Sequence, residues 1–176
     1  GQEGILAVFP FFTPFGFTAM QNLSILAGWA DILVPRSEVR TIIDLTKRYR
    51  PTLLPGSPAV FHGLLTSAPF RKLDITCVKA FITGGAPVPA RMVRALKAQR
   101  DVPVIDLYGL AEASAVAAAS PWDTPERPGN GVLPLPNTDL KIVDPQTGGQ
   151  EVPSGKTGEI WLKGPQVLAA GESEPR

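Results

Sequence analysis

The sequence predicts an α/β fold: a mainly parallel sheet flanked by helices and followed by part of a smaller β subdomain. In the first two thirds of the chain, short apolar runs alternate with segments that have the period of an amphipathic helix, the pattern of a parallel sheet. Beyond them, two strand-like runs flank a turn-rich segment. With 176 residues, of which 44% are hydrophobic, the chain is long enough to bury a sizeable core.

The first half of the chain predicts three strands and two helices. An apolar run at residues 5–12 is the first strand, and a helix over 17–26 with a second strand over 28–35 completes one strand-helix-strand unit. Apolar residues between Val39 and Tyr49 recur at close to 3.6 residues and predict a helix on one face of the sheet. Residues 51–56 follow as the third strand.

The next elements continue the alternation. Ser57 is a capping residue that stands before Pro58, so a helix is predicted to begin there and to run through Leu65. The later elements are a fourth strand, a helix and a fifth strand, predicted at residues 78–83, 89–99 and 102–108.

The composition changes after Ser120. Residues 121–137 contain five prolines and two glycines and are typical of a connector. The runs at 138–144 and 158–164 predict two strands in a hairpin-like region. We therefore expect a domain boundary near residue 130, with an α/β subdomain at residues 1–130 and the start of a β subdomain at residues 131–176.

Composition excludes several classes of protein. A formal net charge of +1 without a basic stripe argues against a nucleic-acid partner. The apolar stretches are shorter than the ~20 residues of a transmembrane segment, and the first residues do not resemble a signal peptide. A single cysteine, Cys77, excludes an internal disulfide framework and suits a reducing compartment. We expect a cytoplasmic protein, with peripheral membrane attachment as an alternative.

Two stretches follow strands at positions where ligands bind in open α/β sheets, beyond the carboxyl ends of the strands. The first is TGGAPVP at residues 83–89. Its two glycines let the chain turn sharply and present a flat strip of backbone to a ring or a phosphate, and Thr83 adds a hydroxyl. A tight turn without a ligand is the alternative interpretation.

The second stretch is DLYGLAEAS at residues 106–114. Tyr108 offers a flat face for stacking, Gly109 a bend, and Glu112 an oxygen ligand that could hold Mg²⁺ near a phosphate. A solvated carboxylate at a helix start is the alternative for Glu112. Because neighbouring parallel strands end at one edge of a sheet, we expect the two stretches to share one crevice.

Several dispersed motifs, taken in order, resemble the adenylate-forming acyl-CoA synthetases, the superfamily of fatty-acyl-CoA ligases, 4-coumarate ligases and luciferases. They are FPFFTPFG (9–16), ADILVP (30–35), LLPGSPAVF (53–61), ITGGAPVP (82–89), YGLAEAS (108–114), PGNGVLPLPNTDLKIVD (128–144) and GEIWLKGPQV (158–167). The resemblance covers essentially the whole chain. It implies the central part of the N-terminal domain of a ligase that joins a fatty acid or other carboxylic acid to CoA through an acyl-adenylate.

The resemblance also implies roles for single residues. Glu112 would be the Mg²⁺ ligand, and Tyr108 would stack on the adenine of ATP. The residues implied to bind the nucleotide are Gly84, Gly85, Ala86, Pro87, Asp106, Leu107, Tyr108 and Gly109. Those implied to border or shape the acyl pocket are Phe12, Phe15, Phe17 and Gly131. ATP and Mg²⁺ are therefore the implied cofactors, with CoA as a co-substrate.

Two catalytic positions depart from the family pattern. Relatives commonly have threonine at the position of Ala111, and its hydroxyl contacts the phosphate of the adenylate. Many have histidine at the position of Thr13, where the ring helps to position carboxylate and phosphate. These departures leave a second reading open beside the working ligase: a catalytically impaired or non-catalytic homologue that binds a nucleotide or an acyl group.

Three parts of the family pattern have no counterpart in the 176 residues. They are the glycine-rich phosphate loop, the Tyr-x-Thr-Gly-Asp motif that holds the ribose, and the C-terminal domain with its catalytic lysine. We expect the rest of a longer polypeptide to supply them, and the isolated chain to be inactive.

Overall fold

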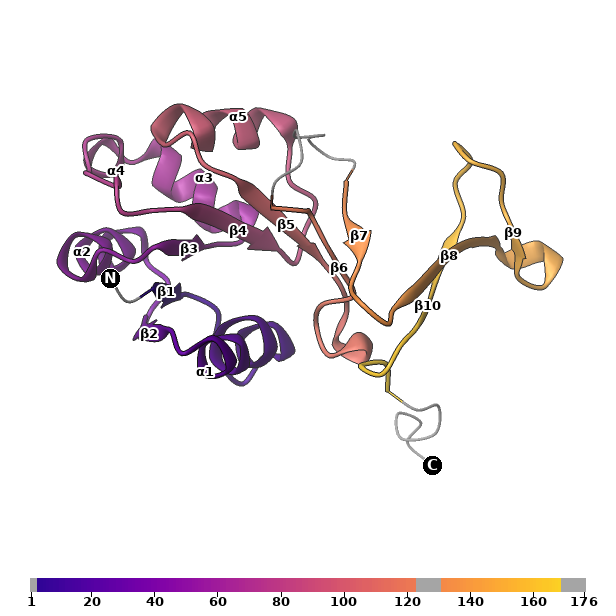
Figure 1. Cartoon of the computed structure of the whole chain (residues 1–176). Coiled ribbons are helices and arrows are strands. Elements are labelled where there is room, and N and C mark those ends of the chain that lie inside the picture. The colour runs from indigo at the N-terminus through magenta and orange to yellow at the C-terminus, as the bar shows by residue number, and fades with distance from the viewer. Residues whose placement is uncertain (1–2, 123–130, 169–176) are drawn as a thin grey trace.

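The computed structural model describes residues 3–122 and 131–168 (Figure 1). The strands of the larger sheet are β1 (Gly4–Ala7), β2 (Ala30–Leu33), β3 (Leu53–Pro55), β4 (Ala80–Gly84), β5 (Val104–Tyr108), β6 (Ala118–Ala119) and β7 (Leu133–Pro134). Their order in space is β2-β1-β3-β4-β5-β6-β7. The first five run parallel, and β6 and β7 are added antiparallel to the β5 edge. The predicted fold class is confirmed.

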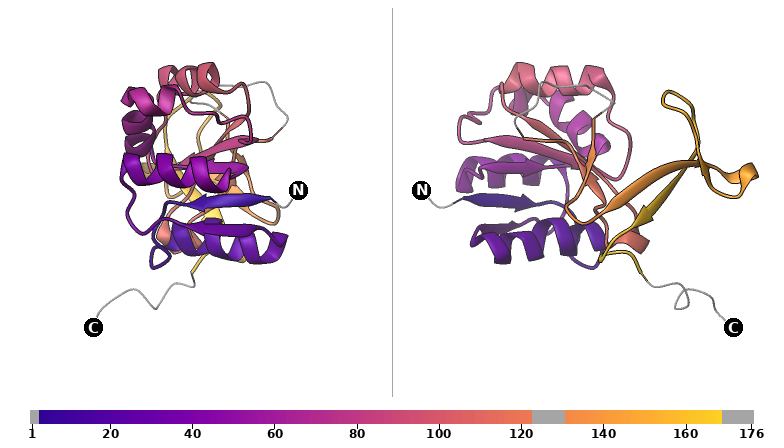
Figure 2. Two further views of the ribbon diagram at one scale, coloured as in Figure 1. Left: turned by 90° about the vertical axis from the view of Figure 1, so that its left-hand side faces the viewer. Right: turned by 45° about the vertical axis from the view of Figure 1, so that its right-hand side comes forward.

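Helices cover the two faces of this sheet unequally (Figures 1 and 2). One face carries α2 (Val39–Tyr49), α3 (Pro58–Thr66), α4 (Ala68–Arg71) and α5 (Ala90–Gln99). The other face carries the π-helix Gly16–Asn22, which continues into α1 (Leu23–Ala27). Among the helices of the described residues, none combines the length and apolar character needed to cross a membrane.

Successive residues of a strand point to opposite faces of the sheet, so the apolar strand residues contribute to two hydrophobic cores, one on each face. These cores hold the helices against the sheet. On the face with four helices, the rings of Phe61 in α3 and Phe81 in β4 pack edge to face with centroids 5.9 Å apart. On the other face, Met20 of the π-helix packs with Ile5 and Ile82 of the strands. Full burial of one such side chain contributes about 1.5–3 kcal/mol.

The ends of the elements follow local chemistry. Ser57 caps α3, its Oγ accepting a hydrogen bond from the Val60 amide at 3.3 Å, as the Ser-Pro start predicts. The helix predicted at Val39–Tyr49 has those bounds. The first strand was predicted over residues 5–12, but β1 ends at Ala7 and that part of the prediction is wrong. Pro10 has no N–H to continue a ladder, and its carbonyl instead accepts from the Thr13 amide at 3.0 Å.

The smaller sheet is antiparallel and consists of β8 (Asp139–Asp144), β9 (Gln150–Glu151) and β10 (Glu159–Lys163), with β8 in the centre. Pairing runs from Asp139 with Lys163 to Val143 with Glu159, so the predicted hairpin-like region is confirmed. It extends away from the larger sheet (Figure 1). Strand β7 lies beyond residue 130 yet pairs with β6 in the larger sheet, so the domain boundary near residue 130 stays a prediction.

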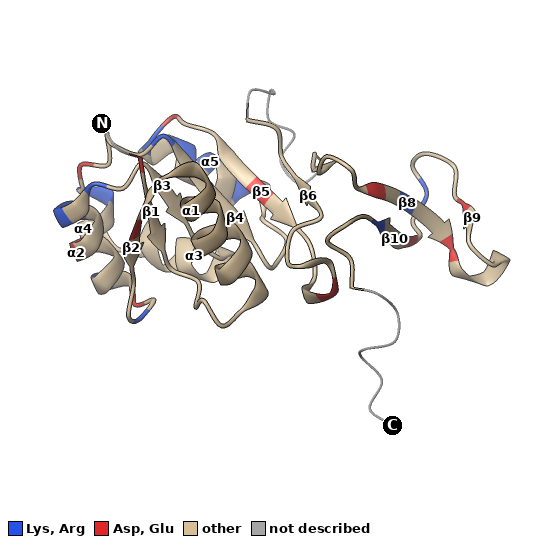
Figure 3. Cartoon of the chain, turned by 60° about the horizontal axis from the view of Figure 1, so that its bottom comes forward, with Lys and Arg blue, Asp and Glu red and all other residues tan. Residues whose placement is uncertain are grey.

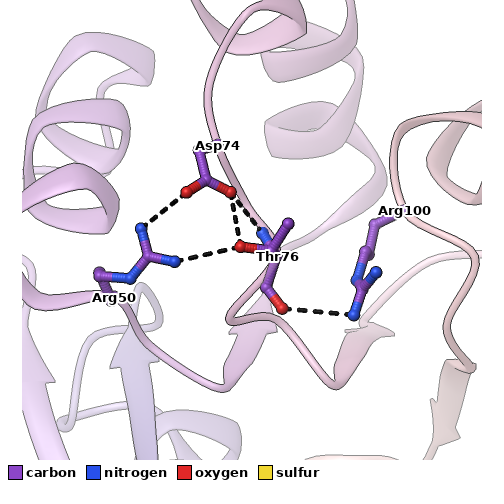
Figure 4. Close-up of polar contacts among 4 residues, drawn as sticks. All are labelled: Arg50, Asp74, Thr76 and Arg100. Atoms are coloured by element: carbon purple, nitrogen blue, oxygen red, sulfur yellow. Dashed lines mark hydrogen bonds and ion pairs between the residues drawn. The ribbon is translucent and has the colours of Figure 1, made fainter.

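A polar cluster, here called the Asp74 cluster, ties together the segments that enter β3, β4 and β5 (Figure 4). It consists of Arg50, Asp74, Thr76 and Arg100. Arg50 bonds through Nη1 to Asp74 and through Nη2 to the Thr76 hydroxyl, at 3.0 and 3.1 Å. Arg100 bonds to the Thr76 carbonyl at 3.3 Å. The cluster therefore fixes the amino ends of the parallel strands, opposite to the edge where ligands bind in such sheets.

Candidate functional site

A cavity of about 380 Å³ lies at the carboxyl ends of β4 and β5, a volume typical of small-molecule sites. Its lining residues are Gly85, Ala86, Pro87, Val88, Asp106, Leu107, Tyr108, Gly109, Gly131 and Val132. Both stretches singled out in the sequence thus meet in one crevice, and Gly131 and Val132 of the connector also line it. Eight of the lining residues are among those implied by the resemblance.

The first wall follows from the end of β4. Thr83 and Gly84 lie opposite Asp106 and Leu107 in the parallel register, which places the two strand ends side by side. Gly85 then takes a left-handed conformation with φ of 79°, which glycine adopts without strain and which turns the backbone. Thr83 is fully buried, and its Oγ1 has no hydrogen-bond partner among the described residues.

The second wall follows from the end of β5. Asp106 is partly buried, and this burial raises the pKa of its carboxyl group. Its backbone is held from both sides by Ser120, whose Oγ accepts from the Asp106 amide at 3.2 Å and whose amide donates to the Asp106 carbonyl at 2.8 Å. The half-buried Tyr108 accepts a backbone bond from Ala117 at 2.9 Å. These contacts fix β5 where it lines the cavity.

Gly109 allows the chain to fold back over the end of β5. A Cβ at this position would collide with the carbonyl oxygen of Ala115. The chain next forms a 3₁₀ turn at Ala111–Ala113, whose first two residues are exposed and lie outside the cavity lining. Figure 3 marks the acidic positions on β5 and on the turn that follows it.

Glu112, the residue that the resemblance implies as the Mg²⁺ ligand, lies on this turn. Among the described residues there is no group of three or more His, Cys, Asp or Glu side chains that could hold a metal. Mg²⁺ is commonly held by only one or two carboxylates together with substrate phosphates and water. A single exposed carboxylate on the turn after the cavity-lining end of β5 therefore fits a metal that is held jointly with phosphates.

Thr13 has a local structural role. Its Oγ1 donates to the Pro10 carbonyl at 2.7 Å and accepts from the Gly16 amide at 3.1 Å, which organises the start of the helical segment. The three phenylalanines assigned to the acyl pocket differ in burial: Phe12 is 90% exposed and Phe17 50% exposed. All of these residues lie outside the cavity lining.

Phe15 is placed closer to the site than the other two phenylalanines. Its ring packs on that of Phe9 with centroids 4.5 Å apart. A Cβ built on Gly84 would lie 2.8 Å from the Phe15 ring and 2.9 Å from the Leu107 carbonyl. Gly84 therefore lies in contact with an aromatic pair on the face of the sheet that the π-helix covers.

A family model described as AMP-binding enzyme matches residues 1–170. The chain belongs to the AMP-binding enzyme family. Curated relatives of this chain include a Long-chain-fatty-acid–CoA ligase of Bacillus subtilis, 33% identical over 99% of the chain and 31% of the relative. Another is 4-coumarate–CoA ligase-like 9 of Arabidopsis thaliana, 33% identical over 90% of the chain and 28% of the relative. The chain spans about a third of the length of these relatives.

Solved structures share the fold of this chain. ATP-bound MatB from Rhodopseudomonas palustris superposes with a TM-score of 0.85 at 30% identity, over 94% of this chain and 32% of that one. An anthranilate CoA ligase in complex with anthranoyl-AMP gives a TM-score of 0.87 at 22% identity, over 94% and 32% of the two chains. At the lower identity the likeness concerns the fold alone.

The sequence patterns did not point to two of the residues that line the cavity, Val88 and Val132. Val88 stands inside the TGGAPVP stretch, where a lone valine is indistinguishable from a core residue, and it is also 7% exposed and packed in the core. Val132 follows Gly131 in the proline-rich connector, which has no periodicity to show which side chains face inward.

Proposed function

We propose that this chain forms the nucleotide- and acid-binding part of an ATP-dependent acid–CoA ligase. In this reaction a carboxylate oxygen of the acid attacks the α-phosphorus of ATP, and pyrophosphate leaves. The sulfur of CoA then attacks the acyl carbon, and AMP leaves as the thioester forms. The observation that carries the proposal is the cavity at the carboxyl ends of β4 and β5, which joins the Gly85–Pro87 backbone strip to Tyr108.

The nucleotide would occupy this cavity through few and simple contacts. We assign the adenine to the space between the backbone strip after β4 and the ring of Tyr108, where flat surfaces favour stacking. Glu112 would hold Mg²⁺, which neutralises charge on the phosphates when bound. The protein groups mainly position the reactants, which is the larger part of catalysis in phosphoryl and adenylyl chemistry.

The acid is proposed to be a fatty acid. Support comes from the curated relatives named Long-chain-fatty-acid–CoA ligase, in Bacillus subtilis and in Yersinia pestis. The ring of Phe15 and the more exposed rings of Phe12 and Phe17 would border an alkyl chain. Other relatives are named for aromatic acids, so an aromatic carboxylic acid is the competing substrate class.

A second candidate function, binding without catalysis, is favoured by two side chains. Ala111 presents only a methyl group on the exposed turn. The hydroxyl of Thr13 is already engaged with Pro10 and Gly16. Neither residue offers the phosphate contact that the resemblance implies at these positions.

Acid-dependent exchange of pyrophosphate into ATP distinguishes the two functions. The full-length protein that carries this chain is compared with its Ala111→Thr variant, using a long-chain fatty acid and benzoate. A ligase should show exchange with the fatty acid, and the added hydroxyl should raise the rate at least about tenfold, since one such transition-state bond contributes about 2–4 kcal/mol. If neither the full-length protein nor its Ala111→Thr variant shows exchange, the result would support binding without catalysis. Faster exchange with benzoate than with the fatty acid would reject the proposal that the substrate is a fatty acid.

The isolated chain of 176 residues is proposed to be inactive in the same assay. Its cavity offers the walls described above, while the remaining contacts to phosphate and ribose are expected from the rest of the longer protein. Exchange by the purified chain alone would contradict this proposal.

A further inference from the structure

The turn that carries Glu112 is short and is followed by an unusual backbone conformation. It is a single 3₁₀ turn of three residues, Ala111–Ala113, a length that has little stability by itself. Two residues in left-handed conformations follow it, Ser114 with φ of 52° and Ala115 with φ of 83°. Non-glycine residues adopt this conformation only where surrounding contacts impose it. Local backbone bonds close the turn, with the amides of Ala113 and Ala115 both donating to the Leu110 carbonyl at 3.0 Å, and further contacts come from a distant part of the chain.

Those contacts come from the segment that follows β10. Ser114 Oγ donates to the Gln166 carbonyl at 2.8 Å, although the two residues are 52 positions apart. The Leu168 amide donates to the Glu112 carbonyl, also at 2.8 Å. The segment 166–168 therefore holds the turn at two points, at Glu112 itself and two residues later.

The same segment is anchored in turn to the start of β8. Gln166 Nε2 donates to Thr138 Oγ1 at 2.7 Å, and Thr138 is 8% exposed. The Gln166 side chain lies close to Gly164, where a Cβ would come within 2.5 Å of its oxygen, so the absence of a side chain at Gly164 leaves room for this contact. Ser114, Gln166 and Thr138 thus form one continuous hydrogen-bonded chain, here called the clasp. It links the turn after β5 to the base of the smaller sheet.

We propose that the clasp positions Glu112, with Ser114 as a positioning residue for the carboxylate that would hold Mg²⁺. The inference rests on the proposed function. The side chain of Glu112 is exposed, so its backbone is the part that the described contacts fix. Without the Ser114 hydroxyl, the turn must be ordered at the moment of binding, and this ordering weakens affinity for the metal.

The test uses the full-length protein with two glycine variants. Ser114→Gly removes the hydroxyl while glycine keeps the left-handed backbone, and Ala115→Gly relieves the neighbouring left-handed residue while the hydroxyl stays. The first readout is the Mg²⁺ concentration that gives half-maximal pyrophosphate exchange. We expect an increase of about three- to tenfold for Ser114→Gly, the effect of one lost hydrogen bond, and less than about twofold for Ala115→Gly.

The second readout is hydrogen exchange of the Leu168 amide, which needs no activity. We expect faster exchange in Ser114→Gly and an unchanged rate in Ala115→Gly. An unshifted Mg²⁺ requirement in Ser114→Gly, or equal shifts in both variants, overturns the positioning role. If the unmodified protein shows no pyrophosphate exchange, the proposed function fails by itself, and the hydrogen exchange rate of the Leu168 amide then tests the clasp. A faster rate in Ser114→Gly than in the unmodified protein supports the clasp, and an equal rate rejects it.

Discussion

Arg50 Nη1 and Asp74 Oδ2 lie 3.0 Å apart, which joins the C-terminal end of α2 to the segment that enters β4 (Figure 4). Arg50 reaches this contact from a left-handed conformation with φ of 48°, directly after the last helical residue. Asp74 also accepts from the hydroxyl and the amide of Thr76, at 2.6 and 2.9 Å. These Thr76 bonds, followed by Arg50, hold the pKa of Asp74 well below its usual range.

Replacement of Asp74 by asparagine is expected to lower the thermal midpoint of the chain at pH 7. A carboxyl group whose pKa is depressed in the folded state stabilises the protein above its unfolded pKa of about 3.9 and loses that contribution as pH falls through the folded pKa. The difference between the parent chain and Asp74→Asn should therefore shrink below about pH 4. Thermal unfolding at pH 7 and pH 3 measures it, with Asp44→Asn on the exposed side of α2 as the control. Equal midpoints at pH 7 would contradict the role of Asp74.

Asp106 should show the opposite pH dependence, because burial raises the pKa of its carboxyl group. The ionised form is less favourable in the folded state than in the unfolded one, so the chain gains stability as pH falls from above the raised pKa toward about 3.9. Asp106→Asn is expected to raise the thermal midpoint at pH 7 and to leave it nearly unchanged at pH 3. A lower midpoint at pH 7 would show that favourable contacts outweigh the cost of burial.

The Ser57 cap gives a stability prediction with an internal control. Ser57→Ala should reduce the free energy of unfolding by about 0.5–2 kcal/mol, because the Val60 amide loses its acceptor. Ser67 occupies the same position before α4 but has no side-chain capping bond. Ser67→Ala should therefore stay within about 0.5 kcal/mol of the parent chain in chemical denaturation. Similar losses in both variants would argue against a specific cap.

Substitution of two phenylalanines, one buried and one exposed, should distinguish a residue that packs in the core from one that is available to contact a substrate. Phe61 is fully buried against Phe81, and Phe61→Ala should cost about 3–5 kcal/mol of unfolding free energy. Phe12 is 90% exposed, and Phe12→Ala should change stability by less than about 0.5 kcal/mol. Denaturation of both variants checks this. Because Phe12→Ala should not affect stability, a change in the activity of this variant with fatty acids would reflect contact between Phe12 and the substrate.

Periodicity and turn chemistry predicted most of the fold. The helix Val39–Tyr49 was placed at its observed bounds, and five parallel strands were found within a few residues. Several short elements of the described residues were missed, among them α4, β6, β7, β9 and the 3₁₀ helix Pro145–Thr147. Strands β6 and β7 have two residues each, so neither shows an alternating pattern, and both depend on pairing with an existing edge.

The candidate site was predictable where it depends on strand order and not where it depends on distant contacts. Parallel strands end at one edge, so the stretches after β4 and β5 had to meet. By contrast, the Ser114 hydroxyl finds its acceptor in a segment that no local pattern connects to it. The π-helix Gly16–Asn22 was likewise predicted only as a helix, because the spacing of apolar residues does not distinguish its wider turn from that of an α-helix.

The cavity takes its walls from three separate parts of the chain: residues 85–88, residues 106–109 and residues 131–132. A molecule that fills it bridges all three and is released when they separate, so occupancy and unfolding are thermodynamically linked. A ligand at one hundred times its dissociation constant would add about 2.7 kcal/mol to the free energy of unfolding. The shift in melting temperature with ATP or AMP would thus report on the pocket even in a chain with no catalytic turnover.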